Sequence, residues 1–406
     1  MKCCIITPYP PDRCGIAVYS KSLISKLSKH IEISVIANKY RKKNSIEVEN
    51  RVRIIRCWRR RTVTCFPRIF MAVAREKPTI IHIQHEYLVY GVRKYSALFP
   101  LLLILLKFLR KPIVVTMHSV IIPDRACERF FREHGVGGRF ATLKRGLTVF
   151  ITRLIHMLSD TVIVHKNLMK NILVTQYGFR EDKVRVIPHG VKAGKLVKEA
   201  KCELGLKDWV ILFVGFIIPG KGIEILIKAF SKLLKSGHDA TLVIAGGYHP
   251  RLRMERRWFI GSIERAVKEN NVEGKVIFLN RFIPEEELDL FISAADIVAL
   301  PYTDDSIAGA SGALARCAPL GKPIIATAIP RFLEDLVDEV NALIVKPGDA
   351  DELANAMIRL IRNPFLRGTI SEGVRKWASE RRWSRVALET VSLYKELVKR
   401  RHSNLL

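Results

Sequence analysis

The chain has 406 residues, 49% of them hydrophobic and 26% charged, and this length exceeds what one ordinary hydrophobic core accommodates. The composition is that of a globular protein, which excludes a largely disordered chain. Lys and Arg number 68 against 39 Asp and Glu, so the formal net charge is +29. This excess suits nucleic acid, an anionic membrane face or a phosphorylated substrate. Basic runs occur at 40–43, 51–61 and 251–257, and a solvated surface is the simpler explanation of any single run.

The cysteine pattern argues against a zinc site. None of the cysteines forms a C-x-x-C pair, and no matching pair of histidines follows them. We therefore expect no zinc site, and reduced, mostly buried thiols in a cytoplasmic protein. The eight cysteines are Cys3, Cys4, Cys14, Cys57, Cys65, Cys127, Cys202 and Cys317.

The first half of the chain alternates short β-branched runs with helix-length patterns. The N-terminal stretch, MKCCIITPYP, predicts a strand and a proline-rich turn and lacks the apolar region of a signal peptide. The apolar segment 97–109 is too short to span a bilayer and contains Lys107, so it predicts a buried helix on a sheet. A membrane-contacting helix is the secondary interpretation of that segment. Strands are predicted at 3–7, 32–37, 53–56, 80–84, 113–118, 161–165 and 184–188, and helices at 17–27 and 168–177.

The second half repeats this scheme. Continuous apolar strands separated by helices are typical of parallel sheets covered on both faces, which predicts two doubly wound α/β domains in series. The boundary is expected within 192–207, giving domains of 1–191 and 192–382. The segment 383–401 is a long amphipathic helix that either caps its own domain or packs back across the first. Strands are predicted at 209–215, 240–245, 275–279, 296–300 and 323–327.

Ligands of open parallel sheets gather beyond the carboxyl ends of the strands, and three loops there belong to the first half. In the strand-to-helix turn 8–19, Gly15 allows close backbone approach, although an ordinary turn is an equally good explanation. Polar residues crowd the segment 81–87, where His82 and His85 face opposite ways, so one of the two is structural. His118 stands at a strand tip, where it can meet a ligand between domains, although a structural histidine is an equally good explanation.

Two further loops belong to the second half. Segment 214–222 passes from strand to helix with glycines and Lys221 available for phosphate. It departs from the phosphate-loop pattern G-x-x-x-x-G-K-[ST], because Gly222 replaces the hydroxyl residue. Segment 301–327 leaves a strand, passes through small residues and enters a helical pattern that stops at Gly321. A helix start beside small residues is a candidate anion site, and the two loops could clamp a diphosphate.

Along nearly its whole length the sequence resembles the family 4 glycosyltransferases, which are retaining enzymes of the GT-B fold. The order and spacing of the matching segments carry the resemblance. They are CGIAVYSKSLISKL, IIHIQHEY, VVTMHSV, VIVHKNLMKNIL, VRVIPHGV, FVGFIIPGKGIEILIKAFSKL, TLVIAGG, FLNRFIPEEELDLFISAADIVALPY, GKPIIAT and NALIVKPGDADELANAMIRLI.

The resemblance implies two Rossmann-like domains facing each other across a cleft, with a nucleotide-sugar donor on the second and an acceptor on the first. It implies that Gly15 lies close to the donor, His118 near the reacting sugar and Lys221 on the diphosphate, beside Gly222. His85 and Glu86 are expected on the acceptor side. No metal is expected, because cations and helix N-termini neutralise the leaving diphosphate. The helix from about 383 to 406 should cross back onto the first domain.

The sequence also departs from the family pattern. Most members carry two glutamates before a segment like GKP, and the corresponding residues here are Ala308 and Arg316. A basic residue is common five positions before the family lysine, where this chain has Phe216. What remains resembles a family variant in which Ser311 and Gly312 open the helix and hold phosphate through backbone N–H groups.

Three nearby acidic residues are candidates for sugar or ribose recognition. Asp304 and Asp305 serve equally well as turn residues that cap a helix. Glu334 follows a proline-bearing turn at the same strand ends and is the better candidate.

The sequence supports two main hypotheses about function. The first is a cytoplasmic hexosyltransferase that uses a GDP- or UDP-sugar and a glycan, glycolipid or lipid-linked acceptor, with retention of configuration. The second is a degenerate homologue that binds a nucleotide-sugar or serves as a scaffold, which the missing glutamates favour. Nucleic-acid binding draws on net charge alone, since no basic module interleaved with aromatic residues is present. Peripheral attachment to the inner face of the membrane is expected from the first-half basic run 51–61, with Trp58 inside it, and from segment 97–109.

Overall fold

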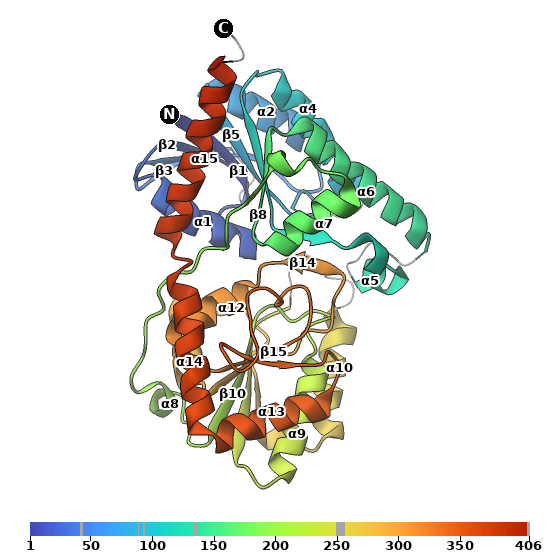
Figure 1. Cartoon of the computed structure of the whole chain (residues 1–406), viewed down its shortest axis with the longest axis vertical. Coiled ribbons are helices and arrows are strands. Elements are labelled where there is room, and N and C mark those ends of the chain that lie inside the picture. The colour runs from blue at the N-terminus through green and yellow to red at the C-terminus, as the bar shows by residue number, and fades with distance from the viewer. Residues whose placement is uncertain are drawn as a thin grey trace. The chain divides into compact units, whose positions relative to one another are not determined.

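The computed structural model describes residues 1–40, 44–87, 89–91, 94–133, 137, 139–248 and 256–403 (Figure 1). The basic runs at 41–43 and 251–255 therefore lie outside the described residues. The chain divides into two compact units. The first comprises Met1–Gly190, Ser306–Ala310 and Trp383–Leu406, and the second comprises Val191–Asp305 and Ser311–Arg382.

An eight-stranded sheet forms the centre of the first unit. Its strand order is β3-β4-β2-β1-β5-β6-β8-β9, and every pairing is parallel except that of β3 with β4. The predicted strands of this half are confirmed, with ends that differ by a few residues. The strands are β1 Lys2–Thr7, β2 Glu32–Asn38, β3 Ser45–Glu49, β4 Val52–Trp58, β5 Ile80–His85, β6 Ile113–Met117, β8 Thr161–Val164 and β9 Val184–Val186.

The edge strand β3 corrects the expectation of purely parallel sheets. It forms a hairpin with β4 through Asn50 and Arg51, whose φ angles of 48° and 67° are those of a tight two-residue turn. Ile46 and Val48 are exposed, so the strand shows no core-facing apolar pattern that the sequence could reveal.

Helices cover both faces of this sheet. Alternate residues of β1 enter two different hydrophobic clusters, Cys4 and Ile6 in one and Cys3 and Ile5 in the other, as expected of a strand buried on both faces. Helices α1 and α15 pack together over the second cluster, whereas α2, α4 and α6 form a layer over the first. The helices are α1 Gly15–Leu27, α2 Cys65–Glu76, α3 Lys94–Ala97, α4 Phe99–Lys107, α5 Glu128–Glu133, α6 Ala141–Leu158, α7 Asn167–Tyr177 and α15 Trp383–Ser403.

Helix α15 is bound to the first unit by buried polar and aromatic contacts. The Tyr394 hydroxyl hydrogen-bonds His82 Nδ1, and Glu396 pairs with Arg185 at 2.8 Å. At the start of the helix, Trp383 lies so close to Gly190 that a Cβ there would be 2.2 Å from the indole. A side chain at position 190 would therefore displace the helix start.

The second unit is built on a six-stranded parallel sheet of order β12-β11-β10-β13-β15-β16. Its predicted strands are confirmed, and β16 was not predicted. The strands are β10 Trp209–Val214, β11 Ala240–Ala245, β12 Val276–Phe278, β13 Ile297–Leu300, β15 Ile324–Thr327 and β16 Leu343–Val345. The helices are α8 Ala200–Glu203, α9 Ile223–Lys235, α10 Arg256–Glu269, α11 Glu285–Ala294, α12 Gly312–Cys317, α13 Ala350–Arg362 and α14 Pro364–Ser379.

A separate two-stranded ribbon belongs to the first unit. Strand β7 (Ser119–Ile121) pairs antiparallel with β14 (Ile307–Gly309), and Ala308 is buried opposite Val120. Because nearly two hundred residues separate the two strands, the sequence of neither short run predicts that they pair.

Candidate functional site

In each unit, the order in which strands are added to the sheet reverses at the first strand of the parallel sheet. Strand β1 lies between β2 and β5, and β10 lies between β11 and β13. Ligands of doubly wound sheets bind outside the carboxyl ends of the strands at such a switch point. The loops to consider are therefore those that follow β1 and β5 in the first unit, and β10 and β13 in the second.

In the second unit, the loop after β10 ends at the start of helix α9. Gly222 is the N-cap of this 13-residue helix, and no side chain caps it. Its φ is 67°, and a Cβ at Gly222 would lie 1.8 Å from the carbonyl oxygen of Pro301, directly after β13. Only glycine lets the two switch-point loops meet here. The N–H groups at the start of α9 are thus left for an anion.

Lys221 lies at this junction. Its Nζ is 3.5 Å from the centre of the Tyr302 ring, a cation–π contact. Burial, together with the charge of Arg331, holds the pKa of Lys221 well below its usual value, while Asp304 acts in the opposite direction. A cation that loses hydration without a full counter-charge gains most from an anionic ligand. Lys221 and the start of α9 together form a candidate anion site of this unit.

Tyr302 and Arg331 were missed by the sequence analysis. Tyr302 is buried, which raises its pKa to about 12, and its hydroxyl is hydrogen-bonded to Ser311. Its ring also contacts Phe332, with ring centroids 5.0 Å apart. Tyr302 follows a predicted strand at the switch point, and this position was the available signal. Arg331 carried none, since it lies in a turn far along the chain.

The Ser311–Gly312 pair has a more structural role than expected. Ser311 Oγ accepts the N–H of Leu314 at 3.2 Å and so caps α12. The expectation that Asp304 or Asp305 caps a helix is wrong in this respect, since α12 is capped by Ser311. Gly312 has open space around its Cα, because a Cβ there would meet no atom within 4 Å.

The helical pattern after Ser311 is shorter than predicted. Helix α12 ends at Cys317, a single 3₁₀ turn of residues 318–320 follows, and Gly321 stops it with a φ of 64°. Within that turn Pro319 lacks an N–H group, which explains why the regular helix does not reach Gly321.

Ala308 and Arg316, the two positions at which the family resemblance leads us to expect glutamates, have structural contacts instead. Ala308 forms part of the ribbon described above. Arg316 is largely buried, pairs with Asp289 at 2.9 Å and donates to the carbonyl of Glu285 at 2.9 Å. Arg316 therefore holds α12 against α11.

Phe216 and Glu334 occupy loops of the second unit. Phe216 is partly exposed in the loop after β10, so this loop presents an aromatic surface where the family resemblance leads us to expect a basic residue. Glu334 is exposed and has a φ of 81°, a backbone conformation that non-glycine residues rarely adopt. Such strained residues cluster at functional sites, and Glu334 stays a candidate on that ground.

In the first unit, Gly15 is the first residue of α1, and no side chain caps this helix. A Cβ at Gly15 would meet no atom within 4 Å, so internal packing does not require glycine there. The preceding loop is fixed by Asp12, which pairs with Arg60 and accepts from Asn38 at 3.1 Å. A rigid loop with open space above Gly15 suits close approach by a ligand.

His118 follows β6 and is partly buried among aromatic rings. Its Nε2 lies 2.8 Å from Gln84 Oε1 and its Nδ1 lies 3.3 Å from His165 Nε2. The ring also packs edge-on against Tyr19, with centroids 4.5 Å apart. Burial, and next the neighbouring His165, keep the pKa of His118 well below its usual value.

Gln84, His118 and His165 form a row of hydrogen-bonded side chains. The positions of the protons in this row follow from the contact that His165 makes with the backbone. His165 Nδ1 lies 3.0 Å from the carbonyl oxygen of Ile187, which only accepts, so this nitrogen carries a proton. His165 Nε2 must then accept from His118 Nδ1. A neutral His118 has only a lone pair left at Nε2, so Gln84 must turn its amide nitrogen toward it. Both ring nitrogens of His118 are thus engaged by the protein.

His165, His189, Tyr19 and Trp383 complete an aromatic cluster that the sequence analysis missed. The ring centroids of His165 and His189 are 5.7 Å apart, and Tyr19 contacts both histidines and Trp383. His165 follows a predicted strand, as His118 does. This position after a strand could have identified His165 as a candidate from the sequence. The cluster brings four elements together around His118.

His85 and Glu86 have different surroundings. The His85 ring stacks on Phe99 at 4.3 Å, and its two nitrogens have no hydrogen-bond partner among the described residues. Burial lowers its pKa to about 3. Glu86 is half-buried and accepts from Ser119 Oγ at 2.6 Å. Of the two expected acceptor-side residues, Glu86 retains a partly exposed polar group. His82, whose nitrogens bond Tyr394 and Thr116, has a structural role.

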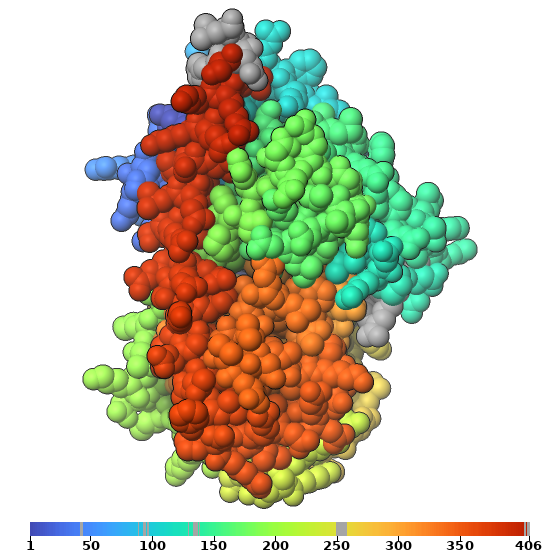
Figure 2. All heavy atoms as spheres, viewed as in Figure 1, coloured from blue at the N-terminus to red at the C-terminus, as the bar shows by residue number. Residues whose placement is uncertain are grey.

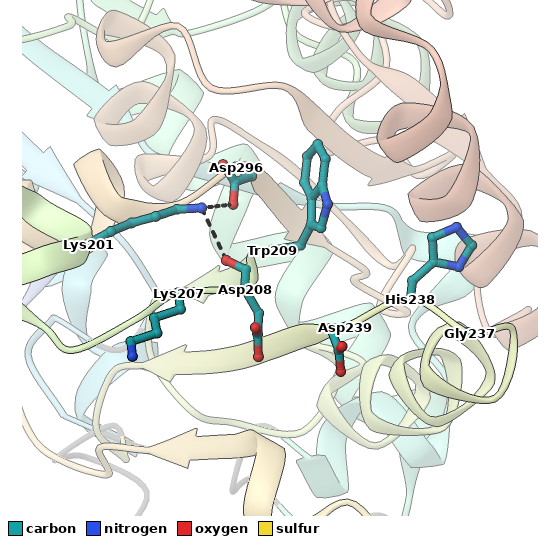
Figure 3. Close-up of a pocket in the computed structure, with 8 residues that line it drawn as sticks. All are labelled: Lys201, Lys207, Asp208, Trp209, Gly237, His238, Asp239 and Asp296. Carbon is teal, nitrogen blue, oxygen red and sulfur yellow. Dashed lines mark hydrogen bonds and ion pairs between the residues drawn. The ribbon is translucent and has the colours of Figure 1, made fainter.

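A hollow of about 440 Å³ in the second unit lies at the amino ends of the strands, where Trp209 begins β10 (Figure 3). The switch-point loops lie at the other, carboxyl ends. Lys201 extends across the hollow to Asp296 at 2.6 Å and to the carbonyl of Asp208 at 3.1 Å. These charges are satisfied by one another, so we assign the hollow a structural role. Within the described part of the chain, no group of three or more His, Cys, Asp or Glu side chains could hold a metal ion.

Comparison with known families identifies two matches. Residues 208–363 match the group 1 glycosyl transferases, and residues 14–195 match glycosyltransferase family 4. An uncharacterized glycosyltransferase of Methanocaldococcus jannaschii is 30% identical over 249 residues, which are 58% of this chain and 60% of that protein. A D-inositol 3-phosphate glycosyltransferase of Saccharomonospora viridis is 26% identical over 250 residues, 59% of this chain and 56% of that protein. The chain thus covers less than two thirds of the length of these relatives.

Solved structures show the same fold over the whole chain. A sucrose-phosphate synthase from Thermosynechococcus elongatus has a TM-score of 0.77 at 21% identity, covering 98% of this chain and 99% of that one. The Anabaena protein HepE, solved with UDP-glucose, has a TM-score of 0.71 at 16% identity, covering 97% and 99%. Residues 14–195 thus match family 4 and residues 208–363 match group 1 of the glycosyltransferases, and the two doubly wound sheets have the GT-B fold.

Proposed function

We propose that this protein transfers a hexose from a nucleotide-diphosphate sugar to a glycan, glycolipid or lipid-linked acceptor, with retention of configuration. The observation that carries the proposal is Lys221, placed over Tyr302 beside the uncapped start of α9. This arrangement offers a charge and backbone N–H groups to a diphosphate leaving group without requiring a metal. HepE was solved with UDP and with UDP-glucose, which supports a uridine donor here, and GDP-sugars are the other candidate.

In the proposed reaction the bond between the anomeric carbon and the diphosphate oxygen breaks, and the acceptor oxygen bonds that carbon on the same face. The acceptor proton leaves with the departing diphosphate, whose charge also stabilises the oxocarbenium-like state. Lys221 and the N–H groups of α9 would stabilise that diphosphate. His118, fixed at both nitrogens, would contact the sugar and position it rather than act as a free base.

A second candidate function is favoured by Ala308 and Arg316. Both positions are built into the fold, so the carboxylates that most relatives place there have no substitute at the same positions. A degenerate homologue that binds a nucleotide-sugar without transferring it is therefore the alternative. Glu334 is the residue we propose for the missing donor contact.

The experiment is a thermal-shift screen with UDP, GDP and their sugars, followed by measurement of nucleoside diphosphate release. Selective stabilisation by one nucleotide-sugar supports both candidates over a protein that binds by charge alone. Turnover of that sugar with an added acceptor supports transfer, whereas tight binding without release of diphosphate would favour the degenerate homologue.

We also propose a cytoplasmic location with peripheral attachment to an anionic membrane face. Among the described residues, no helix is long and apolar enough to cross a membrane. Within the expected attachment run 51–61, however, Trp58 cannot contact a membrane. Trp58 is fully buried and donates to the carbonyl of Ile36 at 3.1 Å, and Arg60 pairs with Asp12. Arg51, Arg53, Arg59 and Arg61 of the run 51–61 are exposed, so the run keeps positive charge for such attachment but presents no exposed apolar side chain.

A further inference from the structure

Helix α6 carries an apolar stripe on its outer face. Leu143, Leu147, Phe150 and Met157 are exposed by 73%, 49%, 58% and 68%, and they recur at helical spacing. On the opposite side, Thr152 and Ile155 are buried. Figures 1 and 2 show α6 running along the outside of the first unit. An amphipathic helix normally turns such a stripe to the core, so this helix presents apolar surface in two directions.

The neighbouring helix α4 extends the surface. Its inner face is buried, as expected of a helix on a sheet, but Leu101, Ile104 and Phe108 are exposed by 41%, 45% and 74%. The expectation of a fully buried helix at 97–109 is therefore wrong for its outer face. Because α4 and α6 pack against each other in one layer over the sheet, their outer residues form one surface, here named the α4–α6 face.

The charge of the α4–α6 face has a single sign. The segments 97–111 and 139–159 contain no Asp or Glu. Their basic residues are Lys107, Arg110, Lys111, Arg139, Lys144, Arg145 and Arg153. Some of these also make contacts within the protein: Lys107 pairs with Asp160 at 3.5 Å, and Arg153 donates to the carbonyl of Tyr177. Apolar side chains bordered mainly by cations, here with Asp160 as a paired carboxylate at the end of α6, are typical of a helix that lies in a membrane interface.

We propose that the α4–α6 face docks on an anionic lipid bilayer. Phe108, Phe150 and the leucines would enter the headgroup and acyl boundary, while the basic side chains reach the anionic headgroups. A second copy of the chain fits less well, because two identical faces would bring like charges together. Docking itself does not require transfer activity. Its purpose, to bring the enzyme to a lipid-linked acceptor, rests on the proposed function.

The test is flotation of the full chain with phosphatidylcholine vesicles that contain phosphatidylglycerol, and with phosphatidylcholine alone. The wild type should float with the anionic vesicles and be released by high salt only in part, since apolar insertion is not screened. The double variant Leu143→Glu/Phe150→Glu should fall to the level seen with neutral vesicles. Phe365→Glu, at an apolar residue of α14 exposed by 84%, is the matched control and should float like the wild type.

Three readouts keep the result interpretable. Circular dichroism melts and nucleotide binding should be unchanged in the double variant, because the altered side chains are exposed and lie outside the second unit. Wild-type protein that stays unbound on anionic vesicles would overturn the proposal, as would a double variant that floats normally. A wild-type dimer that the double variant dissociates would show that the face binds a second copy. Flotation without turnover would contradict the proposed function alone.

Discussion

Lys221 is the residue on which the proposed donor site most depends. Replacing it with Ala should weaken nucleoside diphosphate binding by about 1–3 kcal/mol, the range for a lost charge-assisted contact. Lys228→Ala is the matched control, because this lysine is exposed on the same helix and should leave affinity unchanged. Isothermal titration calorimetry of both variants gives the answer, and equal affinities would remove Lys221 from the site.

The lowered pKa of Lys221 also predicts a pH dependence. A bound diphosphate stabilises the ammonium form, so ligand binding should raise this pKa and take up a proton at pH values above the free-state pKa. Affinity should therefore be greatest at low pH within the range where the diphosphate stays ionised, and should fall as pH rises. Titrations in buffers of different ionisation enthalpy measure the proton uptake, which Lys221→Ala should abolish.

His118 and His165 act as a pair at the residue scale. His118→Ala leaves the buried groups of His165 and Gln84 without their partner, which should cost about 1–3 kcal/mol of unfolding free energy. If His118 positions the sugar, turnover at saturating donor should also fall under conditions where the variant is fully folded. Wild-type turnover by that folded variant would assign His118 a structural role only.

His85 offers a contrasting test. Its ring is buried against Phe99 without a polar partner among the described residues, so His85→Phe removes a desolvated group at similar volume. We expect an unchanged or higher melting temperature at neutral pH. If turnover with a lipid-linked or glycan acceptor falls while stability holds, the side chain contacts the acceptor after all, and the structural assignment is wrong.

At the scale of elements, substitutions at two glycines distinguish a glycine required for packing from one required for ligand contact. Gly222→Ala should destabilise the second unit, since its Cβ would overlap the carbonyl of Pro301 and its φ is 67°. Gly15→Ala should leave the melting temperature unchanged, because its Cβ meets no atom of the chain. A loss of turnover in Gly15→Ala at constant stability would support close approach of the donor, whereas normal turnover would contradict it.

The elements that the sequence predicts well are those whose signal is local. Strands β1, β10 and β11 are continuous apolar runs buried on both faces. A continuous apolar run between two helices identifies such a strand even without an alternating pattern. The elements it misses depend on distant partners. β7 and β14 are three residues each and exist through their pairing, and β3 exists through its hairpin with β4.

The same distinction applies to the site. Lys221 and His118 were proposed from the sequence because each follows a strand that the sequence predicts. The contact between Lys221 and Tyr302 was not, because it arises from two loops brought together across the switch point. Nor could the sequence show that Arg316 holds two helices together, since its partner Asp289 lies on another element.

At the scale of the whole molecule, buried histidines predict acid sensitivity. Burial lowers the pKa values of His82, His85 and His165 to about 3, whereas an unfolded histidine titrates near 6.5. Below pH of about 6.5 the unfolded state binds more protons, so stability is fully present above that pH and is lost as pH falls toward 3. Urea unfolding across this window should show the slope, and His85→Phe should reduce it. A stability that stays constant from pH 7 to about 4 would contradict these histidine assignments.

The central claim is that the second unit binds a nucleotide-diphosphate sugar through Lys221 and that the chain then transfers the sugar. The most direct measurement is release of nucleoside diphosphate from UDP- and GDP-sugars, with and without acceptor, by the wild type and by Lys221→Ala. We predict acceptor-dependent release by the wild type, a strong loss in Lys221→Ala, and normal release by Lys228→Ala. Equal release by the wild type and Lys221→Ala, or tight sugar-nucleotide binding with no release under any acceptor, would contradict the account.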